Sequence, residues 1–132
     1  MKLFKSAKAA LEHIKIISNR SIRNEICGFL GHCMKDNTFV VKESENSSDN
    51  PQSFFLVDPL EYLLFKEKYT FLALYHSHII GDEEPSDFDK EMSENACLPF
   101  LVFSLNTQKV HIYEPQNSDS DVNTLGRIKA LL

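Results

Sequence analysis

The segment Thr70-Phe71-Leu72-Ala73-Leu74-Tyr75-His76-Ser77-His78 decides the fold of this chain. Its apolar part, Phe71 to Tyr75, is continuous rather than alternating, which is typical of a short strand buried on both faces. Such a strand lies in the middle of a sheet. The sequence therefore predicts a central strand that carries His76 and His78 to its C-terminal end.

Periodic segments on both sides of this strand predict the other elements. They are a helix from Ala7 to about Ile17, strands over 26–33 and 38–42, a helix from Asp58-Pro59 to about Lys68, a helix from Ser86 to about Ala96, strands over 100–105 and 109–113, and a short helix over 125–132. This order predicts an α/β (α+β) fold, in which helices flank one mixed β-sheet. We expect a single domain over residues 1–132, with a flexible polar segment at 115–124.

Composition narrows the function classes. The chain has 132 residues, 42% hydrophobic residues and a net charge of −5, without a Lys/Arg-rich stripe that could neutralise a run of phosphates. No apolar run approaches the roughly 20 residues that a membrane span needs, and the N-terminus lacks the features of a signal peptide. Cys27, Cys33 and Cys97 lie in apolar stretches and cannot all pair with one another. We therefore expect a cytoplasmic protein that binds neither nucleic acid nor membrane.

Three residues around the central strand predict a metal site. Two histidines at i and i+2 on a strand point to the same face, so His76 and His78 can reach one ion. Asp89 follows in the first turn of a predicted helix and can supply a carboxylate. Two imidazoles and a carboxylate suit a catalytic zinc ion, which keeps its fourth position open. We predict one Zn²⁺ per chain at His76, His78 and Asp89.

Two further residues have the chemistry that a zinc hydrolase needs beside its metal. Glu25, upstream of an apolar strand, is the candidate general acid/base that takes a proton from water and passes it to the leaving amine. Ser86 is the candidate donor to the oxyanion of the tetrahedral intermediate.

Each feature has a structural interpretation when it is taken alone. His-x-His at a strand end is commonly incidental, and Ser86-x-x-Asp89 is also a helix capping box. Glu25 could be a solvated charge at a strand end. The conjunction favours the site, because His-x-His-x7-Ser-x2-Asp should arise by chance in roughly one sequence in a thousand of this length.

Together these residues resemble the JAMM motif of the MPN-domain (JAB) metalloproteases. The segment 25–30, the Asp58-Pro59 helix start, and Gly81 and Pro85 agree with that family as well. The resemblance implies an MPN-like domain with cytidine-deaminase-like layering, of the prokaryotic or phage-type stand-alone kind. It also implies a deubiquitinase-like zinc isopeptidase that hydrolyses peptide or isopeptide bonds of ubiquitin-like modifiers or their conjugates. One departure is Ile79, which stands where the family usually has proline.

Alternatives to this function remain open at the level of sequence. The stretch from Pro51 to Ser86 also looks like the MPN half of phage tail-tip assembly proteins, which would make the peptidase virion-associated. A non-catalytic MPN scaffold that only binds a partner is the second alternative. The acidic run Asp82-Glu83-Glu84 could favour basic substrates, but we expect it only to solvate a loop. Whether the chain forms a homodimer or needs a partner subunit is not fixed by the sequence.

Overall fold

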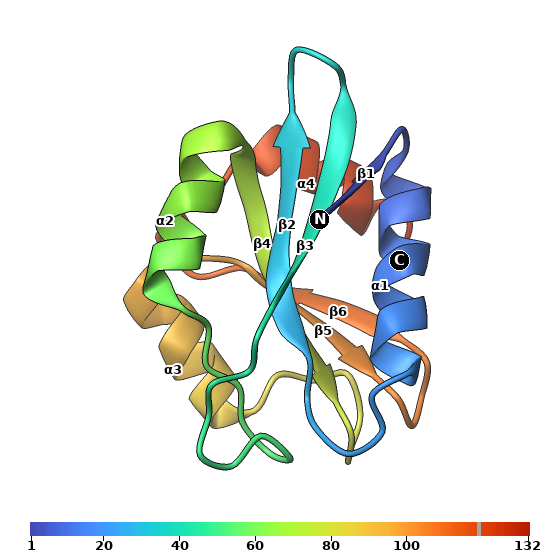
Figure 1. Ribbon diagram of the computed structural model, residues 1–132, viewed down its shortest axis with the longest axis vertical. Helices are drawn as coiled ribbons and strands as arrows, with labels where there is room; N and C mark the ends of the chain where they lie inside the picture. The colour runs from blue at the N-terminus through green and yellow to red at the C-terminus, as the bar shows by residue number, and fades with distance from the viewer. Residues whose placement is uncertain (119) are drawn as a thin grey trace.

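The computed structural model describes residues 1–118 and 120–132, and a six-stranded sheet forms its centre (Figure 1). The strands lie in the order β1-β3-β2-β4-β5-β6. Their bounds are β1 Lys2–Phe4, β2 Cys27–Cys33, β3 Thr38–Ser44, β4 Thr70–His78, β5 Phe100–Ser104 and β6 Val110–Tyr113. Among the described residues only β4 and β5 pair in parallel, so the sheet is mixed as predicted. β4 is buried from Phe71 to Ser77, which confirms it as a central strand.

Helices cover both faces of this sheet. They are α1 Ala7–Asn19, α2 Pro59–Lys68, α3 Asp87–Ala96 and α4 Val122–Lys129. α1 and α4 pack on one face, where Ile14 and Ile128 are buried with Phe39. α2 and α3 lie on the other face, over a second apolar core that includes Phe29 and Phe65 and against which Met92 of α3 packs; these two helices are on the left in Figure 1. None of the helices in the described part of the chain has the length and apolar character of a membrane span.

The connection from β4 to β5 positions the candidate site. Because the two strands are parallel, the chain must cross over between them, and α3 makes this crossover. Ser86 caps the start of α3, and its hydroxyl oxygen accepts a hydrogen bond from the Asp89 backbone N–H at 3.0 Å. The N-terminus of α3 therefore lies next to the C-terminal end of β4, the edge at which open α/β sheets bind their ligands.

Most ends of the predicted elements agree with the observed ones to within two residues, but one strand and the start of the last helix differ more. β1 was not predicted, because three residues that pair only with β3 at the edge of the sheet are too short to show a hydrophobic pattern. α4 begins at Val122 rather than Leu125, since Asp121 caps it by accepting hydrogen bonds from the backbone N–H groups of Asn123 and Thr124. The last three residues of the predicted flexible segment are thus helical, and Asp119 lies outside the described residues.

Candidate metal centre

The three predicted metal ligands lie together at the C-terminal end of β4. His76 and His78 come from β4, and Asp89 comes from the first turn of α3. Potential ligand atoms of these three side chains all lie within 4.8 Å of one another. Asp89 Oδ2 is 3.2 Å from His76 Nε2 and 3.0 Å from His78 Nε2. The group can therefore hold a metal ion.

The hydrogen bonds of His78 show that a positive charge belongs between this ring and Asp89. His78 Nδ1 lies 2.9 Å from the carbonyl oxygen of Asp82, and because a carbonyl only accepts, Nδ1 carries the proton. In a neutral ring, Nε2 then presents a lone pair to the Asp89 carboxylate at 3.0 Å. Two electron-rich atoms at this distance need a proton or a metal ion between them.

The pKa shifts of this pair have the same origin. Burial lowers the pKa of His78, but the hydrogen bonds to Asp89 and to the Asp82 carbonyl outweigh burial and raise it above its ordinary value. Burial raises the pKa of Asp89, whereas its contacts with His76 and His78 lower it by more, so the carboxyl stays ionised. An anionic oxygen beside two imidazoles is a donor set that zinc prefers.

His76 offers a second indication that the centre suits a bound cation. Its side chain is fully buried, and neither ring nitrogen makes a hydrogen bond with the described residues. Nε2 is 3.2 Å from Asp89 Oδ2, but it does not point along the direction of a hydrogen bond. Burial lowers the pKa of His76, which favours the neutral ring that a metal requires. The residues present thus fit a bound cation.

Aromatic rings exclude water from the inner side of the centre. The His76 ring stacks on Phe55, with centroids 4.2 Å apart, and the Phe100 ring packs edge-on against it at 5.7 Å. This apolar wall leaves His76 with few orientations. It also strengthens electrostatic interactions at the centre, because the local dielectric is low.

Glu25 faces the same centre from the loop before β2. Its side chain is buried, and it lines a cavity of about 170 Å³ together with His78, Ser86, Gln52, Ser53 and Ile80. Burial raises the pKa of Glu25 to about 8, an effect that His78 opposes and Asp89 reinforces. A divalent cation bound nearby would favour the ionised carboxylate.

Two residues that sequence reasoning missed hold Glu25 in place. Ser77, between the two histidines, accepts a hydrogen bond from the Ile26 backbone N–H at 2.9 Å, and its own N–H donates to the Ile26 carbonyl oxygen. The Asn46 side chain donates to the carbonyl oxygens of Glu25 and Phe54 at 2.9 and 3.0 Å. Ser77 could have been suspected from its place in the motif, whereas nothing in the sequence singles out Asn46.

Ser86 occupies the rim of the cavity. Its hydroxyl oxygen accepts from the Asp89 backbone N–H, which leaves the hydroxyl proton available to a substrate. The capping role and the proposed oxyanion role are therefore compatible. The backbone N–H of Ser86 completes the capping box by donating to Asp89 Oδ2 at 3.0 Å.

Other contacts fix the loop after His78, although Ile79 stands where the JAMM motif usually has proline. Gly81 adopts a φ of 91°, and its carbonyl oxygen accepts hydrogen bonds from Ser104 Oγ at 2.8 Å and Asn106 Nδ2 at 3.2 Å. The acidic run contacts its own chain, since Thr107 Oγ1 donates to Glu83 Oε1 at 2.7 Å and His111 Nδ1 lies 4.0 Å from Glu84. None of these three acidic side chains is among the residues that line the cavity of Glu25.

A cysteine nucleophile has no support at this centre. Cys27 pairs with His76 across β2 and β4, but burial, assisted by the charge of Glu25, raises the pKa of its thiol to about 12. The thiol is therefore protonated at neutral pH and poorly nucleophilic.

Comparison with known proteins gives the class of the chain. It belongs to the prokaryotic homologs of the JAB domain, whose family model matches residues 8–117. The fold is similar to the solution structure of protein DSY2949 from Desulfitobacterium hafniense, with a TM-score of 0.63 and 26% identity over 86% of each chain. No curated protein matches the sequence. The resemblance to the MPN/JAB family drawn from the motif is thereby confirmed.

Proposed function

We propose that the protein is a zinc-dependent metallopeptidase that hydrolyses a peptide or isopeptide bond next to a ubiquitin-like modifier. The proposal rests mainly on one observation. Asp89 and two histidines form a group that needs a cation, and Glu25 and Ser86 line a cavity against that group. Membership in the JAB family supports the same chemistry.

His76, His78 and Asp89 would hold the zinc ion. When bound, zinc supplies a Lewis acid that polarises the scissile carbonyl and lowers the pKa of water. Glu25 takes a proton from the attacking water and delivers it to the leaving amine. The raised pKa of Glu25 suits a group that must both accept and release a proton near neutral pH. Ser86 donates its hydroxyl proton to the carbonyl oxygen as that oxygen gains negative charge.

The shape of the cavity favours an extended substrate segment. About 170 Å³ between Glu25, Ser53 and Ser86 cannot admit a folded domain, so the scissile bond must enter on a flexible strand of chain. A modifier whose C-terminal tail carries the bond meets this requirement. The resemblance to JAMM enzymes supplies the choice of a ubiquitin-like modifier.

A non-catalytic scaffold explains the site less well. Burying the Glu25 carboxyl costs stability, because burial opposes its ionisation. A surface that only binds a partner has no use for a destabilising buried carboxyl beside a cation site. We therefore favour catalysis.

The proposal is tested with a panel of ubiquitin-like modifiers fused at their C-termini to a reporter peptide. Zinc-loaded wild-type protein should cleave at least one fusion at the modifier's C-terminus. Glu25→Gln should reduce turnover by at least about 100-fold while its zinc content stays unchanged, since the carboxylate transfers protons and is not a ligand. Glu45→Gln is the matched control, because Glu45 is an exposed carboxylate outside the cavity. It should retain full activity.

Two outcomes would contradict the assignment. Loss of zinc in Glu25→Gln would make Glu25 a ligand rather than the general acid/base. Zinc-loaded wild-type protein that cleaves no fusion or peptide in the panel would favour the scaffold.

A further inference from the structure

Helix α2 exposes an unusual number of large apolar side chains. Leu60, Leu63 and Leu64 are 61%, 55% and 52% exposed. The helix buries only Phe65, although Tyr62 also packs partly against the core. A helix that merely covers a sheet shows polar residues on its outer face. The outer face of α2 instead has the composition of an interface.

The apolar surface continues from α2 onto the edge strand β1. Leu3 pairs with Val40, a residue of the core beneath α2, so Leu3 lies on the α2 side of the sheet. Met1, which directly precedes β1, lies on the same side, because it lines a cavity together with Leu64 and Phe65 of α2. Met1 and Leu3 are 65% and 61% exposed. We call Met1, Leu3, Leu60, Leu63 and Leu64 the α2–β1 surface.

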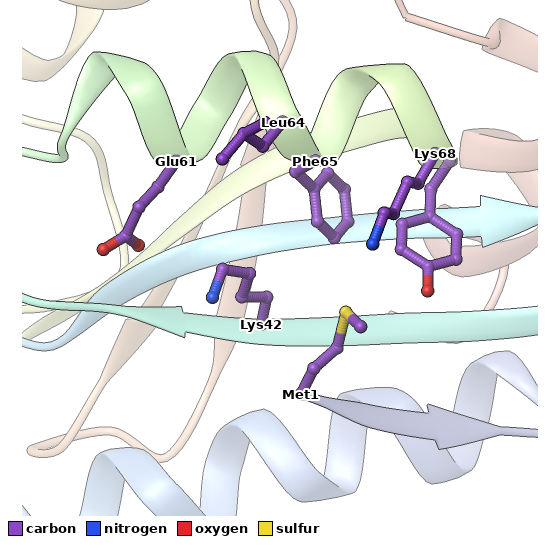
Figure 2. Close-up of a pocket in the computed structure, with 7 residues that line it drawn as sticks. Met1, Lys42, Glu61, Leu64, Phe65 and Lys68 are labelled. Carbon is purple, nitrogen blue, oxygen red and sulfur yellow. The ribbon is translucent and has the colours of Figure 1, made fainter.

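A cavity of about 310 Å³ opens within this surface (Figure 2). It is lined by Met1, Lys42, Glu61, Leu64, Phe65, Lys68 and Tyr69. Figure 2 shows Phe65 and Lys68 of α2 on one side of the cavity, and Met1 and Lys42 on the other. The surface therefore combines exposed leucines with a largely apolar cavity that can accept such a side chain.

Two residues of opposite charge, Glu61 and Lys68, line the same cavity. Glu61 and Lys68 are seven residues apart on α2, so they lie on one side of the helix near its two ends. Glu61 Oε2 is buried and has no hydrogen-bond partner among the described residues. A positive group brought by a partner would satisfy it.

We propose that the α2–β1 surface binds a second copy of the same chain, with the two α2 helices antiparallel about a two-fold axis near Leu64. This arrangement uses one patch on both copies, as a two-fold dimer requires. It places Glu61 of each copy opposite Lys68 of the other. It also lets leucines of each copy enter the cavity of the other.

The exposed area is sufficient for a weak dimer. Five large side chains at about 100 Å² each give roughly 1,000 Å² of apolar surface over two copies, near the lower limit for a specific interface. We therefore expect dimers that dissociate at about 1 to 100 µM. The inference does not depend on the proposed peptidase activity.

Sedimentation velocity of the full chain over about 1 to 300 µM tests the proposal. The wild-type protein should shift from monomer to dimer with concentration. Leu63→Glu should weaken the dimer at least about tenfold, because it places a charge in an apolar contact. Ile22→Glu is the control, since Ile22 is 69% exposed in a loop outside the α2–β1 surface and should leave the dimer unchanged. Both residues are exposed, so both variants should fold.

Charge reversal tests the antiparallel arrangement. Glu61→Lys and Lys68→Glu should each weaken the dimer, and the double variant E61K/K68E should restore it. A wild-type protein that stays monomeric over the whole range would overturn the proposal. So would a dimer that ignores Leu63→Glu, or a double variant that is no better than the single ones.

Discussion

Asp89 Oδ2 lies within 3.2 Å of three nitrogen atoms: Nε2 of His76, Nε2 of His78 and the backbone N of Ser86. One carboxylate thus completes a capping box and forms part of the candidate metal centre. The cap fixes the first turn of α3, and that turn aims the carboxylate at the histidines. The structural and functional interpretations of Ser86-x-x-Asp89 are therefore compatible.

Substitutions can separate the two roles. Asp89→Ala should weaken zinc binding by at least about 100-fold, because it removes one of three protein ligands. Ser86→Ala loses the cap, which costs about 1 kcal/mol of stability, but it should keep its zinc. Asp87→Ala, an exposed acidic residue in the same helical turn, is the control. Zinc affinity is measured by competition with a chromogenic chelator, and an unchanged affinity in Asp89→Ala would exclude this residue from the site.

The site was predictable where its residues are close in sequence. His76, His78 and Asp89 lie on one strand and the helix that follows it, so their spacing alone places them together. Glu25 was found only through its fit to a reaction and to a family motif. Asn46 was missed because it acts through tertiary hydrogen bonds between loops, which leave no local pattern.

At the scale of elements, β2 and β3 pack closely against the Tyr75 side chain of β4, next to the candidate metal centre. A Cβ atom added to Gly28 would overlap the Lys42 carbonyl oxygen and the Tyr75 ring. The Tyr75 hydroxyl donates to that same carbonyl at 3.2 Å, so the ring cannot move away without losing this bond. Glycine at this position lets three strands pack beside the candidate centre.

Two glycine substitutions should therefore have opposite effects. Gly28→Ala should lower the free energy of unfolding by about 3 kcal/mol, because no space exists for a methyl group. Gly126→Ala should raise it by about 0.5 to 1 kcal/mol, since Gly126 is helical and has open space around it. Urea denaturation of both variants measures the difference. A Gly28→Ala protein as stable as wild type would contradict the packing described for β2.

The cap of α4 should make its contribution depend on pH. A hydrogen bond from Thr124, with bonds from backbone N–H groups, lowers the pKa of Asp121 below its ordinary value. Because the folded pKa is the lower one, the stabilisation is present above about pH 4 and is lost as the pH falls through the folded pKa. Asp121→Ala should thus cost about 1 kcal/mol at pH 7 and less below pH 4.

Asp121→Asn is the control for this effect. Asparagine is also a good capping residue but does not titrate, so the difference between Asp121→Asn and Asp121→Ala should not change with pH. A difference between wild type and Asp121→Ala that stays constant from pH 7 to about pH 3 would show that the carboxylate charge is irrelevant to the cap.

Most helices and strands were predictable from the sequence, and the differences between the predicted and the observed elements have physical causes. Long periodic segments such as α1 and the continuous apolar run of β4 were predicted within two residues of their observed ends. β1 was missed because its structure comes from pairing with β3 rather than from its own sequence. The exposed face of α2 could not be foreseen either, because leucines in a helix look the same whether they are buried or exposed.

On the scale of the whole molecule, the candidate centre joins segments that are far apart in the chain. Glu25 lies before β2, the histidines end β4, and Asp89 begins α3. The sheet brings the first two together through the pairing of Cys27 with His76. The α2–β1 surface is formed by other elements, so dimer formation and metal binding can be tested independently.

The zinc content of the purified full chain, prepared without added metal or chelator, tests the central claim most directly. Elemental analysis should find about one zinc per chain in the wild-type protein and far less in His76→Ala and Asp89→Ala. A folded wild-type protein that contains no metal and takes up no added zinc would contradict the account.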